Sequence, residues 1–346
     1  MHEALLYEKL PGSRVRCHTC QWRCLINPDK TGVCGMYRNK DGTLFSLNYA
    51  LVSSLAADPI EKKPLFHFHP GTICLSLGTL GCNFQCKHCQ NWQISTADSS
   101  DLLKECREIT PETEIKLAGQ YGCRGIAWTY NEPAIWFEYT LDSARLAREN
   151  DLYTVYVTNG FATPEALDEI GPYLDAWRVD IKGFSDEFYK ELAGVPRWRE
   201  ILDVTRRAKD KWNMHVEVVT NIIPTMNDDN EQLNGIAGWI RDNLGELTPW
   251  HVTRFYPNHE MMHLPQTPIE TIERACDIGH QAGLKFVYAG NVPGHDSENT
   301  RCYSCGKLNV ARHGYQTEVT GLDGPKCKYC GTDLNFTLSD PKEGKK

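Results

Sequence analysis

Short apolar stretches rich in β-branched and aromatic residues recur through the middle of the chain, and helical segments lie between them. Runs of this kind, bounded by turn residues, are typical of buried strands. The expected strands span 73–80, 125–130, 153–159, 176–182, 215–223, 250–256 and 285–291. Because strands that alternate with helices form parallel sheets, the pattern predicts an α/β fold. Six or seven β-α units can close partly or wholly into a barrel, with ligands at the carboxyl ends of the strands.

Thr-Pro pairs mark the starts of three expected helices, at 110–111, 163–164 and 267–268. Each pair places an N-cap side chain before a proline at the first helical position. Glu270 lies three residues after Thr267, which predicts a capping box for the last of these helices.

Clusters of cysteine divide the chain into three expected parts. Residues 1–62 form an N-terminal four-cysteine module, residues 63–295 the α/β core, and residues 296–346 a C-terminal module with a polar tail. We expect the last residues of that tail, PKEGKK, to be frayed.

The composition is that of a globular protein. Of 346 residues, 41% are hydrophobic and 24% charged, which excludes a disordered, collagen-like or coiled-coil chain. The chain has neither an apolar run of about 18 residues nor an apolar leader at its start, so we expect a cytoplasmic protein without membrane segments. The net charge of −8 disfavours a general nucleic-acid binder, although a local basic patch stays open.

The unusual feature is 15 cysteines, eleven of them in three tight clusters. Spacings of two and three residues indicate metal sites more than disulfides, which cytosolic proteins rarely use. Four cysteines stand alone and are expected to be buried as small apolar residues: Cys74, Cys106, Cys123 and Cys276.

The central cysteine set (Cys82, Cys86 and Cys89) has the spacing C-x3-C-x2-C and follows the first core strand. A [4Fe–4S] cluster normally takes four thiolates. With three, one iron stays open for a chelating substrate, as a catalytic zinc keeps an open position. The alternatives are a zinc site with a fourth ligand such as His88, or three unrelated thiols. Trp92 and Trp128, near this set, are expected in the core.

The C-terminal cysteine set (Cys302, Cys305, Cys327 and Cys330) consists of two C-x2-C-G units. Four thiolates make a closed tetrahedral site, so this set predicts a structural zinc ribbon, with rubredoxin-like iron as the rival.

The N-terminal cysteine set (Cys17, Cys20, Cys24 and Cys34) has a less regular spacing. It can hold zinc, which we favour at this point, or an auxiliary [4Fe–4S] cluster that relays electrons or binds substrate. An exchange of cysteines between the two ends of the chain also stays open.

A cysteine pattern C-x3-C-x2-C with an aromatic residue before the third cysteine is the signature of radical S-adenosylmethionine (SAM) enzymes. Here His88 replaces the usual Tyr or Phe. The chain also resembles one subgroup, the radical SAM component of the AmmeMemoRadiSam system, which is itself similar to pyruvate formate-lyase activating enzymes. The resemblance rests on segments 58–71, 81–95, 129–135, 158–161, 180–184, 220–228 and 288–294.

This resemblance implies a partial (β/α)6 barrel that holds a [4Fe–4S] cluster and SAM. One electron, from a flavodoxin or ferredoxin, would cleave SAM to methionine and a 5′-deoxyadenosyl radical, which abstracts hydrogen from a substrate. The family name implies Memo-like and AMMECR-like companions. Neither the substrate, which we expect to be a protein, a peptide or another bulky molecule, nor a catalytic residue can be identified from the sequence.

The resemblance also implies contacts to SAM at the ends of the strands. Glu132 would accept a hydrogen bond from the SAM ammonium group, or else be a helix N-terminal carboxylate. Asn159 would bind the ribose or the methionine carboxylate, or else form an Asn-Gly turn. Asp180 and Lys182 share one face of a strand, where Lys182 would pair with an anionic group or form a structural ion pair. Asn291 would lie near adenine, or else in a Gly-Pro turn.

Three functions follow. The first is a radical SAM enzyme that acts on a bulky substrate. The second is an activase that installs a glycyl radical on a partner enzyme. The third is a non-enzymatic zinc-binding interaction protein, which leaves the three-cysteine central set unexplained.

Overall fold

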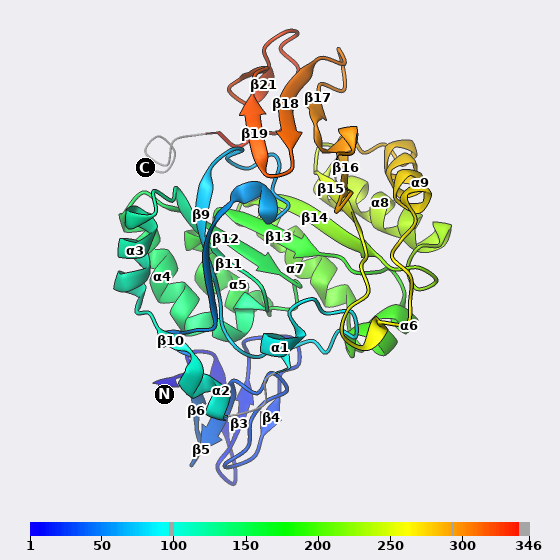
Figure 1. Ribbon diagram of the computed structural model, residues 1–346. Coiled ribbons are helices and arrows are strands. Elements are labelled where there is room, and N and C mark those ends of the chain that lie inside the picture. Colours follow the sequence, from blue (N-terminus) through cyan, green and yellow to red (C-terminus); the bar gives the residue numbers. More distant parts are fainter. Residues whose placement is uncertain (97–99, 293, 339–346) are drawn as a thin grey trace.

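An eight-stranded sheet forms the centre of the computed structural model, which describes residues 1–96, 100–292 and 294–338 (Figure 1). Its strand order is β16-β15-β14-β13-β12-β11-β9-β8. The strands are β8 (Ser54–Pro59), β9 (Ile73–Gly78), β11 (Gly125–Trp128), β12 (Tyr153–Thr158), β13 (Ala176–Asp180), β14 (His215–Ile222), β15 (Trp250–Arg254) and β16 (Val287–Gly290).

The seven strands from β9 to β16 are parallel, and each lies within a range expected from the sequence. The predicted α/β arrangement with a parallel sheet is therefore confirmed, with seven parallel strands. Antiparallel β8 adds to the edge at β9 and comes from the range 1–62, so part of that range belongs to the central sheet.

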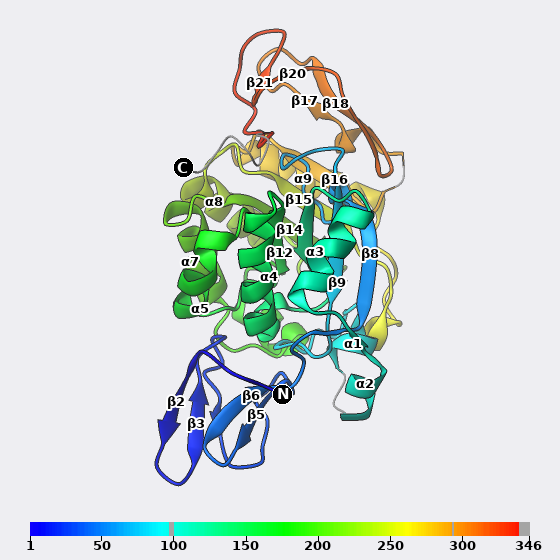
Figure 2. The same cartoon turned by 90° about the vertical axis from the view of Figure 1, so that its left-hand side faces the viewer.

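Helices connect the parallel strands, and the longer ones cover one face of the sheet (Figure 2). The helices are α1 (Trp92–Ser95), α2 (Ser100–Glu105), α3 (Pro111–Gln120), α4 (Phe137–Glu149), α5 (Pro164–Ile170), α6 (Asp186–Phe188), α7 (Arg199–Asp210), α8 (Asn230–Leu244) and α9 (Ile269–Gln281). A π-helical turn, Tyr189–Ala193, follows α6, and 3₁₀ turns lie at Ile60–Lys62, Pro133–Trp136, Gly171–Tyr173, His259–Met261 and Asp296–Glu298. No helix in the described ranges is both long and apolar enough to cross a bilayer.

Two of the three expected N-caps form. The Thr110 hydroxyl accepts a hydrogen bond from the Thr113 N–H at the start of α3, and the Thr163 hydroxyl one from the Ala166 N–H at the start of α5. The third prediction is wrong, because α9 begins at Ile269 without a side-chain cap.

Thr267 is fully buried and serves the sheet instead of the helix. Its hydroxyl donates to the Ile222 carbonyl at the end of β14 (2.6 Å) and accepts from the Phe255 N–H just after β15 (3.0 Å). Because its hydroxyl is engaged there, the capping box with Glu270 does not form.

The two faces of the sheet differ in what covers them. Large side chains on the helical side, among them Trp128, Trp177 and Trp250, are fully buried in the main core. Leu65 and Phe68, from the segment before β9, belong to a second buried cluster together with residues of β9, β11, β12 and β13. This segment therefore packs against these four strands.

Small sheets at both ends of the chain form two modules. The N-terminal module has β1 (His2–Glu3), β2 (Tyr7–Leu10), β3 (Arg14–Cys17), β4 (Leu25–Ile26), β5 (Tyr37–Lys40) and β6 (Thr43–Ser46), and a β7–β10 pair (Leu51–Val52 with Arg107–Glu108) follows. The C-terminal module has β17 (Thr300–Arg301), β18 (Leu308–His313), β19 (Gln316–Val319), β20 (Leu322–Asp323) and β21 (Lys326–Cys327). The expected frayed tail, PKEGKK, lies outside the described residues.

The two modules lie at opposite edges of the central sheet (Figures 1 and 2). The N-terminal module meets the carboxyl ends of the strands, where the Gln21 N–H donates to the Phe161 carbonyl just after β12 (2.9 Å). The C-terminal module meets the amino ends, where the Thr337 hydroxyl is 3.1 Å from Nδ1 of His215, the first residue of β14. Only the N-terminal module therefore borders the candidate site.

Of the lone cysteines, Cys74, Cys123 and Cys276 are buried as expected, whereas Cys106 is half-buried. Trp128 is in the core as expected. The prediction for Trp92 is wrong: its side chain is 37% exposed and stacks on the ring of His259 at 5.1 Å.

Candidate iron–sulfur and S-adenosylmethionine site

The central cysteine set lies on the loop that follows β9. Gly81, with φ of +83°, turns the chain directly before Cys82. The loop is then held by backbone hydrogen bonds from Gln85 N–H to the Ala193 carbonyl and from Lys87 N–H to the Leu192 carbonyl. A backbone N–H also points at a sulfur, since Phe84 N lies 3.4 Å from Cys82 Sγ.

Burial makes the thiolate forms of the central set costly. It raises the pKa of Cys82 well above its ordinary value, and raises the pKa of Cys86 to about 11 in spite of the nearby Lys182 ammonium. A buried thiolate needs a positive partner, and a bound metal centre supplies one.

Two buried polar atoms in this loop have no hydrogen-bond partner among the described residues: Asn83 Nδ2 and His88 Nδ1. The sulfurs of the set are also not packed tightly. Among the described residues, only the C-terminal cysteine set brings three or more possible ligand atoms within 4.8 Å of one another. His88 and the central set therefore do not form a compact zinc site. Three thiols that are spread out, one N–H directed at sulfur and two unpaired polar groups fit an iron–sulfur cluster, whose sulfides accept hydrogen bonds.

Glu132 lies just after β11 and is fully buried. Its Oε1 accepts from the Ala134 N–H (3.0 Å) and the Thr158 hydroxyl (2.7 Å), and its Oε2 accepts from the Asn159 N–H (2.7 Å). Burial raises the pKa of Glu132 to about 7 against these three donors. The carboxylate caps a helical turn and joins the ends of β11 and β12, and Oε2 keeps capacity for one more donor.

Asn159 connects the end of β12 to the cysteine loop. Its Nδ2 donates to Asn83 Oδ1 (2.7 Å), and its Oδ1 accepts from the Phe161 N–H (3.0 Å), which closes a turn around Gly160. Asn83 was not among the residues singled out in the sequence, although it lies inside the C-x3-C interval.

Asp180 and Lys182 form the ion pair that was the alternative to a cofactor contact. Lys182 Nζ lies 2.9 Å from Asp180 Oδ2, and Arg178 binds the other carboxylate oxygen. Burial opposes the charge on Asp180, but Arg178 and Lys182 outweigh it and lower the pKa to about 2. Burial opposes the charge on Lys182, but Asp180 and, to a smaller extent, Cys86 of the cysteine loop raise the pKa of Lys182 above its ordinary value.

Asn291 lies apart from these residues, just after the edge strand β16. Its φ is +60°, its Nδ2 donates to the Arg254 carbonyl, and its carbonyl accepts from the Tyr256 hydroxyl. The structure thus brings together the central cysteine set, Glu132, Asn159 and the Asp180–Lys182 pair, and places Asn291 in a turn at the sheet edge.

The C-terminal cysteine set is compact. Sγ of Cys302 lies 3.6 Å from Sγ of Cys330, and Sγ of Cys305 lies 3.7 Å from Sγ of Cys327. Zinc–sulfur bonds of about 2.3 Å in a tetrahedron place sulfurs about 3.8 Å apart. This set can therefore bind a single metal ion without rearrangement.

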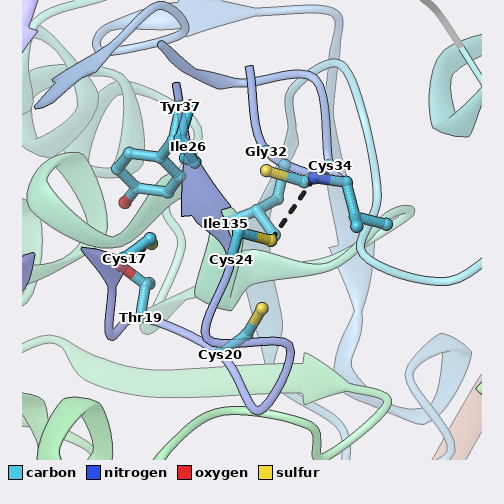
Figure 3. A pocket seen from close by; sticks show the side chains of 10 residues that line it. Cys17, Thr19, Cys20, Cys24, Ile26, Gly32, Cys34, Tyr37 and Ile135 are labelled. Atoms are coloured by element: carbon cyan, nitrogen blue, oxygen red, sulfur yellow. Dashed lines mark hydrogen bonds between the residues drawn. The ribbon is translucent and has the colours of Figure 1, made fainter. Parts of the chain in front are cut away.

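The N-terminal cysteine set surrounds a pocket (Figure 3). Val33 N–H points at Cys24 Sγ from 3.5 Å, and Ile135 of the core closes one side of the pocket. Burial raises the pKa of Cys17 to about 12 and that of Cys34 to about 11.

Comparison with known proteins agrees with this geometry. The profile of the Radical SAM superfamily matches residues 77–237, which include the central cysteine set and every strand from β11 to β14. Over 340 residues, 98% of this chain and 100% of the relative, the chain is 42% identical to the uncharacterized protein MJ0808 of Methanocaldococcus jannaschii. The chain therefore contains a domain of the Radical SAM superfamily.

Pyruvate formate-lyase 1-activating enzyme of Escherichia coli is a more distant homologue of this radical SAM protein. It is 24% identical over 227 residues, which cover 60% of this chain and 89% of the relative. A radical SAM methyltransferase from Sphaerobacter thermophilus has the same fold, with a TM-score of 0.50 and 17% identity over 70% of this chain and 71% of that one. The chain is an enzyme, which removes the non-enzymatic zinc-binding protein from the alternatives.

Proposed function

We propose that this radical SAM enzyme generates a 5′-deoxyadenosyl radical and uses it on a bulky substrate, which we expect to be a protein, a peptide or a molecule of similar size. The central cysteine set would hold the [4Fe–4S] cluster. When bound, this group supplies the open coordination site for SAM and the electron that cleaves it. The observation that carries the proposal is the loop of three separated cysteines at the carboxyl ends of parallel strands, in which Asn83 Nδ2 and His88 Nδ1 are buried without a partner among the described residues.

The chain's own residues would orient SAM. Glu132 Oε2 has one remaining lone pair for an ammonium group. Asn159 holds the cysteine loop against β12 through Asn83, so it would set the distance between the cluster and the cofactor. The Asp180–Lys182 pair would face the sulfonium and carboxylate side of the cofactor, and Asn291 would contribute only from the sheet edge, near adenine.

The proposal also covers the architecture of the chain, the metal of the C-terminal set and the partner proteins. We propose that the open sheet is a partial barrel, that the chain divides at 62/63 and 295/296 with β8 of the first part joined to the central sheet, and that the C-terminal cysteine set binds zinc. The electron donor would be a flavodoxin or ferredoxin in the cytoplasm. Memo-like and AMMECR-like proteins would be companions if the chain belongs to the AmmeMemoRadiSam system.

The experiment is SAM cleavage by anaerobically reconstituted enzyme with dithionite. We expect 5′-deoxyadenosine and methionine from the wild type and less than about 1% of that rate from Cys86→Ala, since removal of one ligand disrupts the cluster. Cys276→Ala is the matched control, because Cys276 is a buried cysteine on α9, outside all three sets, and it should retain the wild-type rate. No 5′-deoxyadenosine from iron-loaded wild type would overturn the proposal.

A second candidate is a glycyl-radical enzyme activase, favoured by the homology to pyruvate formate-lyase 1-activating enzyme. Incubation with SAM, dithionite and a candidate glycyl-radical enzyme should then produce the doublet of a glycyl radical in the electron paramagnetic resonance (EPR) spectrum. Cleavage of SAM without this doublet, for every partner tested, would favour the first candidate.

A further inference from the structure

The three cysteine sets differ in how far apart their sulfurs lie. The C-terminal set is contracted, with sulfur pairs at 3.6 and 3.7 Å. Neither the central nor the N-terminal set has even three sulfurs within 4.8 Å of one another, although all of these cysteines lie in the described ranges. The N-terminal set therefore resembles the central set and not the zinc-like set.

The four N-terminal cysteines also line a pocket, together with six other residues. In a four-cysteine zinc site each sulfur lies about 2.3 Å from the centre, which leaves no room for a sphere the size of a water molecule between the sulfurs. The pocket lined by all four N-terminal cysteines admits such a sphere, with about 10 Å³ of room for it. A cluster puts several atoms between its ligands, so its ligands lie farther from a common centre.

The lining of this pocket suits a cluster. Besides the four sulfurs it consists mainly of Ile26, Val33, Tyr37 and Ile135. A backbone N–H already points at one sulfur, from Val33 to Cys24. An apolar wall and N–H groups directed at sulfur are features that tune iron–sulfur clusters.

The pocket lies directly against the proposed SAM site. An added Cβ on Gly81, the residue before Cys82, would come within 2.6 Å of the Cys34 carbonyl oxygen. Trp22 Nε1–H donates to the carbonyl of Asn83 (2.7 Å), inside the cysteine loop. Ile135, which closes the pocket, belongs to the turn that Glu132 caps. Backbone contact thus joins a ligand segment of one set to a ligand segment of the other.

We propose that the N-terminal cysteine set holds an iron–sulfur cluster of the [4Fe–4S] type, in contact with the loop of the central set. This reverses the preference for zinc that the spacing alone gave. The C-terminal set lies at the opposite edge of the sheet and holds a single zinc ion. The N-terminal cluster is a second redox centre beside the site of SAM binding, and its existence does not depend on SAM cleavage.

Iron and zinc analysis of anaerobically reconstituted protein tests the proposal. We expect about eight irons and one zinc per wild-type chain. The triple variant Cys82→Ala/Cys86→Ala/Cys89→Ala should keep about four irons, and Cys20→Ala/Cys34→Ala should also keep about four, because each loses one cluster. The matched control Cys305→Ala/Cys330→Ala should keep about eight irons and lose its zinc. Wild type with about four irons and two zincs, or with about five irons, overturns the proposal even if no variant folds.

Magnetic coupling tests the contact between the two sites. In fully reduced wild type the EPR signals of two adjacent clusters should be broadened and split. The triple variant of the central set should show one unbroadened signal of the [4Fe–4S] type. Two independent, unbroadened signals in the wild type would contradict the adjacency, and the absence of any cluster signal in the triple variant would contradict the N-terminal cluster.

Discussion

Two buried glutamates show that the surroundings of a carboxyl group can shift its pKa in opposite directions. Glu217 accepts four hydrogen bonds, from the Nε2–H groups of His215 and His251 and from the backbone of Phe66 and His67. Burial alone would raise its pKa, but the two histidines outweigh burial and lower the pKa well below its ordinary value. Glu114 Oε1 accepts a hydrogen bond from Trp128 Nε1, and burial raises the pKa of Glu114 to about 7 against this donor and the nearby hydroxyls of Ser143 and Tyr139.

Substitution by glutamine should therefore cost far more stability at Glu217 than at Glu114. Glu217→Gln should lower the free energy of unfolding by about 3 kcal/mol at pH 7, because an amide group would face N–H donors. A depressed pKa stabilises the folded protein above the ordinary pKa, near 4.5, and this contribution is lost as the pH falls further. The difference in the free energy of unfolding between wild type and variant should therefore become smaller below about pH 4.5. Chemical denaturation at a series of pH values measures this difference.

Glu114→Gln is the matched control. Its raised pKa means that the folded state favours the protonated, neutral carboxyl, so an amide should cost less than about 1 kcal/mol and cost least at high pH. If both variants lost the same free energy of unfolding at pH 7, this explanation would be contradicted.

At the scale of elements, the helix starts show what a Thr-Pro pair can and cannot specify. The hydroxyls of Thr110 and Thr163 cap α3 and α5. The hydroxyl of Thr163 also donates to the His18 carbonyl in the N-terminal module (2.6 Å), so this cap connects two parts of the molecule.

Thr163→Ala should therefore cost more than Thr110→Ala. Loss of the cap alone costs about 1 kcal/mol, which is our expectation for Thr110→Ala. Thr163→Ala also leaves the His18 carbonyl without its hydroxyl donor, and we expect about 2 kcal/mol in total. Urea unfolding of both variants measures the difference, and indistinguishable midpoints would show that the contact with His18 contributes nothing.

At the scale of the whole molecule, the two modules have different relations to the site. The C-terminal module is anchored at the amino ends of the strands: Arg312 donates to the Phe66 carbonyl (2.6 Å), and Nδ1 and Nε2 of buried His67 pair with the Leu334 carbonyl and the Tyr288 hydroxyl. This edge is remote from the cysteine loop (Figure 1).

Loss of the C-terminal metal should therefore affect stability and not chemistry. We expect Cys305→Ala/Cys330→Ala to lower the unfolding temperature by several degrees, since a structural metal site contributes directly to folding. The rate of SAM cleavage well below the unfolding temperature should stay within about twofold of wild type. A tenfold loss of cleavage by a folded, iron-loaded variant would show that this module takes part in the reaction.

The sequence by itself determined the seven parallel strands, the three cysteine sets and two of the three helix caps. These features depend on residues close together in the chain: apolar runs, Cys spacing and Thr-Pro pairs act locally. The resemblance to radical SAM enzymes implied Glu132, Asn159, Asp180 and Lys182, which lie at or shortly after the ends of their strands, where parallel strands bring side chains together.

Only the tertiary structure decided which groups meet across the chain. Thr267 was predicted as a helix cap but binds β14 and β15, and Trp92 was predicted in the core but is exposed. The role of Asn83 became visible only through its hydrogen bond from Asn159. Spacing could not distinguish the N-terminal from the C-terminal cysteine set, because ligand separation depends on how distant segments pack. One set contracts to the size of a single ion at the far edge of the sheet, and the other stays open against the central cysteine loop.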